Sequence, residues 1–252
     1  MKVTVCEMRD DRAGFAEDWA SLVVHVRTNA SDLVLLNELP FAPWFGTAPH
    51  FDAAVWQTVV AEHESWIKRL SELAPATVIT TRPVDHGARR LNEGFLWTAD
   101  SGYQAIHAKY YLPDEEGVWE ASWYHRGDDN FQMAQTSWGN IGFLICSELW
   151  ALGRAQAYGK AGAHLLVTPR ATGRSTVDKW LVGGRAAAMV AGAFALSSNR
   201  VHDSDFGGQG WVIDPDGAIL GVTSREQPFV TVEIDLRHAE AAKQTYPRYV
   251  LD

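Results

Sequence analysis

Cysteine is scarce in this chain of 252 residues, which contains only Cys6 and Cys146. Two thiols so far apart do not make a disulfide framework, and no paired-cysteine zinc motif is present. Both thiols fit a reducing compartment, and we expect a cytoplasmic protein. The low count also raises the question of whether either cysteine carries chemistry.

Positive charge is in deficit as well, because 22 Lys and Arg residues stand against 31 Asp and Glu, a net charge of −9. A chain this acidic has no general attraction for phosphate backbones, so we expect no nucleic-acid partner. Long apolar runs are absent too. The longest, Ala186–Leu196, is far short of the roughly 20 residues that span a bilayer. We therefore expect no membrane partner.

Motifs for cofactors and metals are also missing. The chain has no dinucleotide-binding glycine motif after a strand, no phosphate-binding loop and no H-E-x-x-H sequence. None of its nine histidines has a convincing metal-ligand spacing. The sequence therefore predicts neither a cofactor nor a metal site.

Strand-like and helix-like segments alternate along the chain, which predicts one α/β domain over residues 1–252 built on mixed sheets. Helices are expected at Phe15–Arg27, Phe51–Leu73, Leu149–Ala161 and Thr176–Val190. Strands are expected at Lys2–Glu7, Asp32–Asn37, Thr77–Thr80, Glu93–Thr98, Tyr103–Tyr111, Ile141–Ile145, His164–Thr168, Phe194–Ser198, Gly210–Ile213, Ile219–Val222 and Phe229–Ile234.

Cys146 is the most informative cysteine, because the apolar strand Ile141–Ile145 leads directly into it and a helix is expected directly after it. Such an elbow presents a side chain at the carboxyl edge of a sheet, and the start of a helix favours the reactive thiolate. The alternative is an inert buried cysteine, one of the most common buried residues.

A nucleophilic thiol needs a base and a group that stabilises an oxyanion. Glu38 and Lys109 also follow predicted strands, and the carboxyl ends of parallel strands meet at one edge of a sheet. Each could instead be an exposed charge at a strand end. Three reactive groups at three strand ends favour a shared site.

These residues carry a resemblance that extends over nearly the whole chain. Asn37-Glu38-Leu39-Pro40, Lys109 with Leu112-Pro113, and Leu144-Ile145-Cys146-Ser147-Glu148 resemble, in order, the glutamate, lysine and cysteine segments of the nitrilase superfamily, the carbon–nitrogen hydrolases. The resemblance implies a four-layer αββα sandwich of two mixed β-sheets flanked by helices. It also implies that αββα units pair through their helices into a homodimer or larger homo-oligomer.

The resemblance further implies a role for each motif residue. Glu38 would be the general base, Cys146 would form a thioester or thioimidate, and Lys109 with the next backbone N–H after the cysteine would hold the oxyanion. Glu120, eleven residues after the lysine, would orient Lys109 or the substrate. No cofactor is implied. The substrate would be a small-molecule amide or carbamoyl amide.

The chain departs from the family pattern near two of these residues. Tyr111 stands where many relatives have a histidine after the lysine. Ala151-Leu152-Gly153 and Gln156 replace the Phe-Pro-Glu and Arg that brace the following helix in relatives. The bracing of the cysteine segment is therefore expected to differ.

Substrate contacts are expected from residues next to these motifs: Phe41, Trp119, Ser147, Trp150 and Arg170. The aromatic residues would suit an apolar acyl group, although each could simply pack the core. Arg170 could bind a substrate carboxylate or pair with a structural acid such as Glu148.

Three other functions compete with that of an amide hydrolase. A nitrile hydrolase would use the same residues, but Ser147 stands where true nitrilases usually have Trp. An inactive binding or assembly protein is disfavoured by the intact Glu38, Lys109, Glu120 and Cys146. An α/β-hydrolase needs small residues two places either side of its nucleophile, where this chain has Leu144 and Glu148.

Overall fold

The computed structural model describes residues 1–250 and contains one continuous 12-stranded sheet that folds into two facing halves. In chain order, the first half contains β1 (Lys2–Arg9), β2 (Leu33–Leu35), β3 (Thr77–His86), β4 (Arg89–Thr98), β5 (Gly102–Ala108) and β12 (Phe229–Glu233). The second contains β6 (Met133–Gln135), β7 (Asn140–Phe143), β8 (Leu165–Pro169), β9 (Phe194–Val201), β10 (Trp211–Ile213) and β11 (Ile219–Val222).

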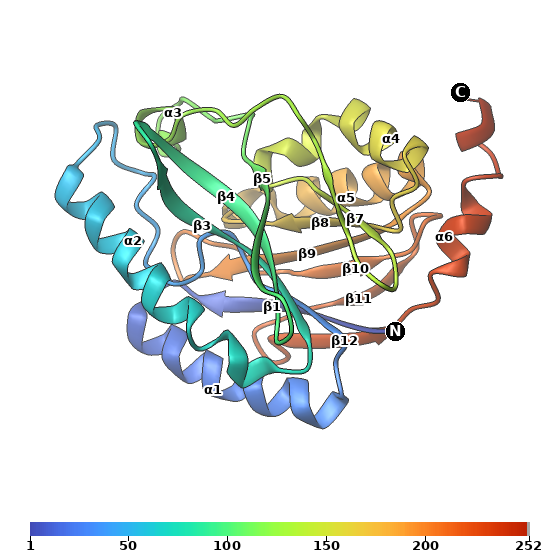
Figure 1. Ribbon diagram of the computed structural model, residues 1–252, viewed down its shortest axis with the longest axis horizontal. Helices are drawn as coiled ribbons and strands as arrows, with labels where there is room; N and C mark the ends of the chain where they lie inside the picture. The colour runs from blue at the N-terminus through green and yellow to red at the C-terminus, as the bar shows by residue number, and fades with distance from the viewer. Residues whose placement is uncertain (251–252) are drawn as a thin grey trace.

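Helices cover the outer face of each half (Figure 1). The first half packs against α1 (Arg12–Asn29) and α2 (Ala53–Ile67), and the second against α4 (Leu152–Lys160) and α5 (Val177–Ala191). The C-terminal segment adds α6 (Arg237–Ala242). The layers run α, β, β, α within one chain, which confirms the predicted sandwich. Pairing with a second copy stays a prediction.

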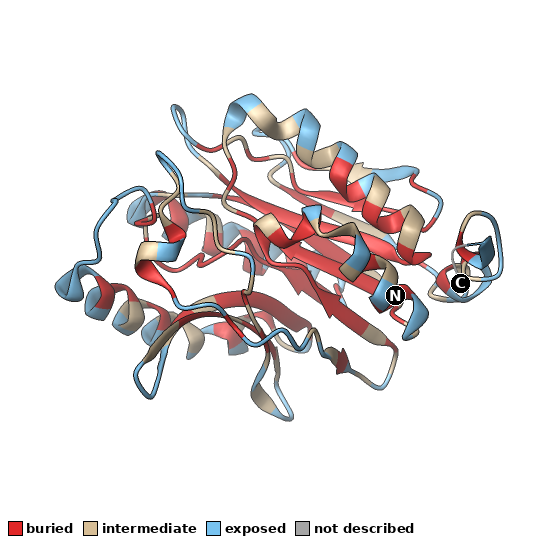
Figure 2. Cartoon of the chain, turned by 90° about the horizontal axis from the view of Figure 1, so that it is seen from above, coloured by how far each residue is buried: buried red, intermediate tan, exposed pale blue. Residues whose placement is uncertain are grey.

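Alternating side chains along β1 show how the layers form. Val3 and Val5 lie in the core between the two halves, whereas Cys6 and Met8 lie in the core beneath α1. Successive residues of a strand point to opposite faces, so one strand can supply both cores. Figure 2 shows the result, with buried residues concentrated in the strands and exposed residues on the outer sides of the helices.

The two halves join where β1 changes partner. Lys2–Cys6 pair with β12, and Glu7–Arg9 pair in parallel with β9. Pairing is also parallel between β1 and β2, β2 and β3, β7 and β8, and β8 and β9. The carboxyl ends of these strands therefore lie at one edge, where the sequence predicted the site.

Most of the predicted elements are present, with three informative differences. β3 continues to His86 because Arg82–His86 pair with β4, although Pro83 and the polar residues around it resemble a loop in the sequence. The helix expected after the cysteine divides into a 3₁₀ helix, η2 (Cys146–Trp150), and α4. The short β6 and α6 have too few residues to show a clear period.

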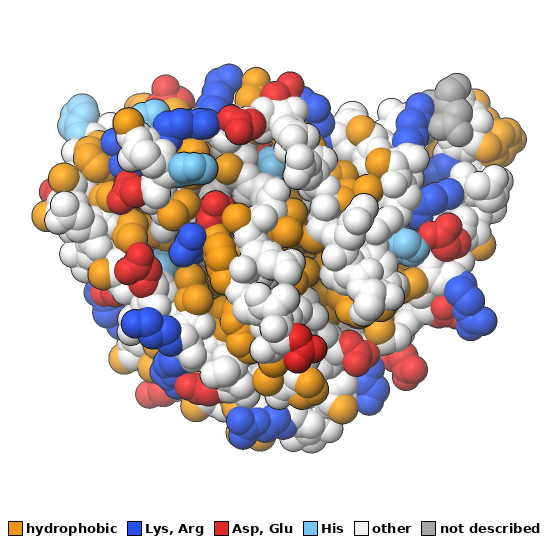
Figure 3. Space-filling view, in the orientation of Figure 1, with side chains coloured by type: hydrophobic (Ala, Val, Ile, Leu, Met, Phe, Trp, Pro, Cys, Tyr) orange, Lys and Arg blue, Asp and Glu red, His pale blue; other side chains and the backbone are white. Residues whose placement is uncertain are grey.

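Charged side chains of both signs are interspersed on the face shown in Figure 3. Within residues 1–250, no helix combines the length and the apolar composition needed to cross a membrane.

Candidate active site

Three charged side chains meet at the carboxyl edge of the sheet. Glu38 follows β2, Lys109 follows β5, and Glu120 begins the short helix α3 (Glu120–Trp123). Lys109 Nζ donates a hydrogen bond of 2.8 Å to Glu38 Oε1 and another of 2.8 Å to Glu120 Oε1. None of the three side chains is more than 1% exposed. The structure thus brings these sequence-predicted residues together as one buried cluster.

The cluster holds Lys109 in its charged form. Burial lowers the pKa of the ammonium, but the charges of Glu120 and Glu38 outweigh burial and raise the pKa above its ordinary value. Burial raises the pKa of Glu120, and the like charge of Glu38 adds to this, whereas Lys109 opposes it. One cation is therefore shared between two carboxyl groups.

Cys146 lies beside this cluster at a strained elbow between β7 and η2. Its φ of +48° is in the left-handed region, which residues other than glycine rarely adopt. The residue is only 5% exposed. The charges of Glu38, Lys109 and Glu120 all act on its thiol. The elbow expected from the sequence is present, with its side chain turned into the buried cluster.

The thiol of Cys146 is not activated in advance. Burial raises its pKa above the ordinary value and the charge of Glu38 raises it further, whereas Lys109 and the backbone N–H of Ala171 lower it. These effects outweigh the expected influence of the short helix η2. Cys146 therefore keeps its proton at rest, and a nucleophilic role requires a base.

Glu38 has an oxygen available for that proton. Its Oε2 atom is buried and has no hydrogen-bond partner within residues 1–250. The other oxygen accepts hydrogen bonds from Lys109 Nζ and, at 2.8 Å, from Asn92 Nδ2. Asn92 was not predicted from the sequence. Asn92 stands between Leu91 and the charged Glu93 in β4, so its local sequence gives no signal of this contact.

The loop that carries Glu38 is held by Arg200, whose role the sequence did not reveal. Arg200 Nε donates to the Glu38 carbonyl oxygen at 3.2 Å, and its Nη1 donates to the Ala42 carbonyl oxygen at 3.0 Å. The same guanidinium contacts the carbonyl oxygen of Leu39, which has a φ of +47°. These contacts hold the loop backbone around Glu38 in an otherwise unfavourable conformation.

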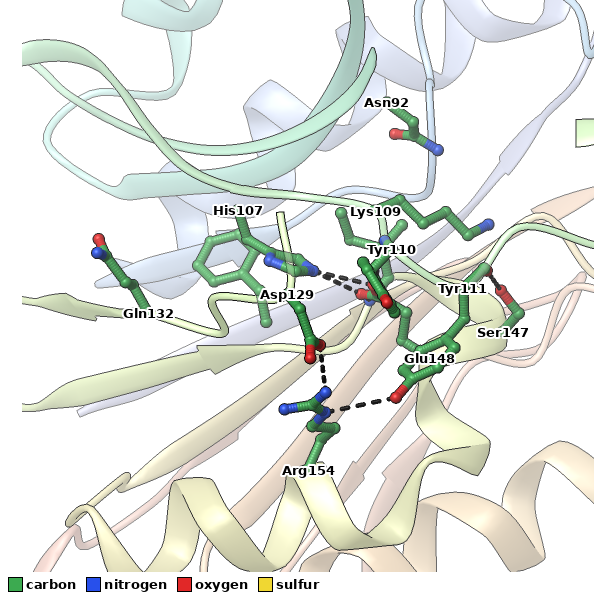
Figure 4. Close-up of polar contacts among 12 residues, drawn as sticks. Asn92, His107, Lys109, Tyr110, Tyr111, Asp129, Gln132, Ser147, Glu148 and Arg154 are labelled. Atoms are coloured by element: carbon green, nitrogen blue, oxygen red, sulfur yellow. Dashed lines mark hydrogen bonds and ion pairs between the residues drawn. The ribbon is translucent and has the colours of Figure 1, made fainter. Parts of the chain in front are cut away.

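Glu148 joins the lysine segment to the cysteine elbow (Figure 4). Its Oε1 accepts from the Tyr110 backbone N–H at 2.7 Å, and its Oε2 accepts from the Ile145 backbone N–H at 2.8 Å. The His107 Nε2 atom lies 3.0 and 2.9 Å from the two oxygens. Glu148 and His107 are both buried. They connect the segments of Lys109 and Cys146, and His107 was not predicted.

Residues at and near the departures from the family motif connect the lysine segment with the helices that follow Cys146. Arg154, on α4, forms an ion pair with Asp129, and its Nε lies 3.4 Å from the Tyr111 hydroxyl (Figure 4). The Ser147 hydroxyl donates to the Tyr111 carbonyl oxygen at 2.6 Å. Tyr111 thus connects the lysine segment with both η2 and α4. The Ser147 hydroxyl therefore takes part in a contact between η2 and the lysine segment.

The aromatic residues proposed for substrate contact lie in three different settings. Phe41 is 3% exposed, and its ring stacks on that of Trp66 with 5.9 Å between the ring centres. Phe41 therefore packs in the core beneath α1 and α2, which was the alternative to substrate contact. Trp150 is 48% exposed, and the centre of its ring lies 5.1 Å from the centre of the Trp180 ring. Trp119 is half-buried and directly precedes α3. Only Trp119 adjoins a residue of the charged cluster in the chain.

Arg170 follows β8 and is fully buried. Its guanidinium donates hydrogen bonds to Ser197, Thr172 and the Gln209 carbonyl oxygen. Arg170 forms no ion pair with Glu148 in the described part of the chain, so that expected alternative is wrong; Glu148 instead contacts His107 and the backbone N–H groups of Tyr110 and Ile145. Within residues 1–250, no group of three or more His, Cys, Asp and Glu side chains could hold a metal ion.

The site therefore offers a thiol, a carboxylate with an oxygen available and an ammonium ion, all buried together. A nucleophile, a base and an electrophilic donor are the groups that covalent catalysis at a carbonyl carbon requires.

Comparison with known proteins agrees with this chemistry. The carbon-nitrogen hydrolase family model matches residues 2–244. N-carbamoylputrescine amidase from Arabidopsis thaliana is 23% identical over 89% of this chain and 82% of its own length. Citrullinase from Francisella tularensis is also 23% identical, over 89% of this chain and 85% of its own length.

A solved structure supports the same grouping at the level of the fold. A carbon-nitrogen hydrolase from Helicobacter pylori G27 superimposes with a TM-score of 0.87 at 21% identity, covering 99% of this chain and 94% of that one. On the strength of the family match across nearly all of its length, this chain belongs to the carbon-nitrogen hydrolase family.

Proposed function

We propose that this protein hydrolyses a non-peptide carbon–nitrogen bond, that of a small-molecule amide or carbamoyl amide, through a thioester on Cys146. The observation that carries the proposal is the buried cluster in which Lys109 bridges Glu38 and Glu120 beside the cysteine. Buried charges are costly, and such a cluster is typical of a site whose groups are held ready for reaction.

The first half of the reaction begins with proton transfer. Glu38 Oε2 takes the thiol proton while Cys146 Sγ attacks the carbonyl carbon, because the resting thiol is protonated. The developing oxyanion is held by Lys109 Nζ and the Ser147 backbone N–H. Lys109 has three N–H groups and donates to two carboxylates, which leaves one for the oxyanion.

The second half releases the product and restores the thiol. Glu38 returns its proton to the leaving nitrogen, the carbon–nitrogen bond breaks, and ammonia or an amine departs. Glu38 then takes a proton from water, whose oxygen attacks the thioester carbon. The carbon–sulfur bond breaks, the carboxylic acid leaves, and Cys146 regains a proton. Glu120 orients Lys109 throughout by holding its ammonium group.

An amide is favoured over a nitrile as the substrate. Two of the relatives are named as an amidase and a citrullinase, and Ser147 follows the cysteine where true nitrilases usually have Trp. Trp119 and Trp150 are proposed to contact the acyl part of the substrate. A nitrile substrate, or an inactive chain that serves as a binding or assembly protein, are the alternatives.

The test is a panel of amides, carbamoyl compounds and nitriles assayed for ammonia release, with mass spectrometry of products from matched amide and nitrile pairs. Rapid quenching of the best substrate should reveal an acyl group on the peptide that contains Cys146. Exclusive turnover of the nitrile would overturn the amide assignment. No turnover of any class, with no acyl adduct, would favour the inactive protein.

Self-association is a separate proposal from the same family membership. The Ala- and Gly-rich segment Arg185–Ala195, which includes the end of α5, would allow close packing against a second copy, giving a homodimer or larger homo-oligomer. The alternative is that these small residues pack inside one chain, where Ala187, Ala188 and Ala191 are buried. Light scattering should give a mass at least twice that of the chain, and a monomeric mass would contradict this.

A further inference from the structure

Among residues 1–250, the hydrogen-bond partners of the buried Arg170 guanidinium are all neutral. Its side chain is fully buried after β8. Nε donates to Ser197 Oγ at 2.7 Å, Nη1 to Thr172 Oγ1 at 2.9 Å, and Nη2 to the Gln209 carbonyl oxygen at 2.7 Å. The guanidinium also lies 3.9 Å from the centre of the Trp211 ring. Three anchors and an aromatic face hold the group rigidly.

The other two buried arginines among the described residues each form an ion pair with a carboxylate. Arg200 forms an ion pair with Asp10, and Arg248 forms one with Asp216 at 2.8 Å. In the part of the chain that the structure describes, no carboxylate forms an ion pair with Arg170. An isolated buried charge is unfavourable, so its presence requires an explanation beyond packing.

The peptide group that follows Arg170 touches two residues of the site. Its carbonyl oxygen accepts a hydrogen bond of 3.2 Å from the Glu38 backbone N–H. Its N–H, which belongs to Ala171, acts on the Cys146 thiol and lowers its pKa. One peptide therefore lies between the residue proposed as base and the residue proposed as nucleophile, and the Arg170 side chain anchors it.

We propose that Arg170 is a positioning residue for the nucleophile: its anchored side chain fixes this peptide between Glu38 and Cys146, and its uncompensated charge favours negative charge on the sulfur. The proposal rests on the proposed function, because it takes Cys146 to be the nucleophile.

The charges that face Cys146 come from four elements. Glu38, from the loop after β2, and Glu120, on α3, disfavour the thiolate, whereas Lys109, after β5, favours it. Arg170, after β8, adds a second cation. Burial lowers the pKa of Arg170 to about 9, and a negative charge on Cys146 opposes that shift. Arg170 is thus still protonated at neutral pH, and its removal should raise the pKa of the thiol.

The experiment compares Arg170→Met, which has a similar length and no charge, with Arg170→Lys, which keeps the charge. Iodoacetamide alkylation of Cys146 is followed across neutral and alkaline pH, with peptide mass spectrometry to separate it from Cys6. Arg170→Met should slow alkylation at a given pH about tenfold, the equivalent of about one pH unit. The alkylation rate of Arg170→Lys should stay near that of the wild type. In both variants kcat should change more than KM.

Arg248→Met is the matched control, because it removes a buried guanidinium whose charge is balanced by an ion pair with Asp216. It should leave the alkylation profile of Cys146 unchanged. Circular dichroism establishes that each variant is folded. If Arg170→Met does not fold, Arg170→Lys decides: a near wild-type alkylation rate with a lower kcat supports the proposal, and an unchanged kcat overturns it.

Other results would overturn the proposal directly. A wild-type alkylation profile in Arg170→Met would do so, as would equal slowing in the Lys and Met variants. So would a rise in KM confined to amides that bear a carboxylate, because Arg170 would then be a receptor for that carboxylate. Alkylation is measured without turnover, so these failures are distinguishable from failure of the proposed function, in which no acyl group forms on Cys146.

Discussion

The two cysteines of this protein are buried to a similar degree, yet their surroundings differ completely. Cys6 lies in the regular strand β1, and its thiol donates to the Leu35 carbonyl oxygen at 3.2 Å. Cys146 lies at an elbow with a φ of +48°, among the charges of Glu38, Lys109 and Glu120. Burial raises the thiol pKa at both sites, to about 12 for Cys6.

Neither burial nor thiol acidity separates the two residues. What separates them is a neighbouring carboxylate with an oxygen available and a cation that remains charged in the protein interior. A buried cysteine becomes a candidate nucleophile through the groups around it. Four predictions test this contrast, in order of decreasing effect.

The first prediction removes each sulfur in turn. Cys146→Ala should lower kcat by at least about 10⁴-fold, because the covalent route is lost. Cys6→Ala should leave turnover within a few-fold of wild type, because Cys6 lies on the side of β1 that faces α1. Steady-state ammonia release measures both. Turnover that survives Cys146→Ala would remove the basis of the contrast.

The second prediction concerns Glu38. Glu38→Gln should lower kcat about 10²- to 10⁴-fold through loss of the base. The same change should make alkylation of Cys146 at neutral pH faster, because the charge of Glu38 raises the pKa of the thiol and its removal lowers it. A lower pKa leaves more thiolate at any pH below it. Iodoacetamide labelling measures this, and labelling of Cys6 should remain unchanged.

Slower labelling of Cys146 in Glu38→Gln would contradict the electrostatic arrangement described for the site. Equal acceleration at Cys6 would indicate a general loosening of the fold and would also contradict it.

The third prediction concerns the cation. Lys109→Met should lower kcat about 10²- to 10³-fold through loss of an oxyanion donor. It should also lower the free energy of unfolding by about 3–5 kcal/mol, because Glu38 and Glu120 lose a buried partner. Kinetics and urea unfolding measure the two effects.

Lys243→Met is the control for this change, since Lys243 is partly buried and donates to the carbonyl oxygens of Gly192 and Ala239. The kcat of Lys243→Met should equal that of the wild type. A normal kcat in Lys109→Met would exclude the ammonium from the reaction.

The fourth prediction compares the anchors of the two cysteine segments. Glu148→Gln replaces an acceptor oxygen with an N–H₂ group and leaves one buried backbone N–H unpaired, which should cost about 1–3 kcal/mol in unfolding free energy and slow turnover. Ser198→Ala removes the hydroxyl that accepts from the Cys6 N–H at 2.9 Å, and should cost about 1 kcal/mol without slowing turnover. Urea unfolding and kcat measure both. An equal decrease in kcat in Glu148→Gln and Ser198→Ala would contradict the difference proposed between the two cysteine segments.

Much of the fold was predictable because its signals are local. The apolar run Leu33-Val34-Leu35-Leu36 is typical of a strand buried on both faces, and its residues lie alternately in the core between the two halves and in the core beneath α1. Element lengths were less predictable. Polar residues near Pro83 concealed the end of β3, which only its pairing with β4 defines.

The charged cluster was predictable in part. Glu38, Lys109 and Cys146 each follow a predicted strand, and strands that run in the same direction bring their ends together. Glu120 came from the family spacing alone. Asn92, His107 and Arg200 were not predicted, because nothing in their local sequence indicates which distant group each one contacts.

The sequence motifs and their order identified the family and, through that resemblance, the layered fold and the candidate site residues, because short motifs can be recognised without knowledge of distant contacts. The partners that hold those residues are evident in the folded chain alone. Arg200 reaches the Glu38 carbonyl oxygen across 162 positions of the chain, whereas Arg170 forms no ion pair with a carboxylate of residues 1–250. Hydrogen bonds depend on distances of about 3 Å in space, and separation along the chain does not encode them.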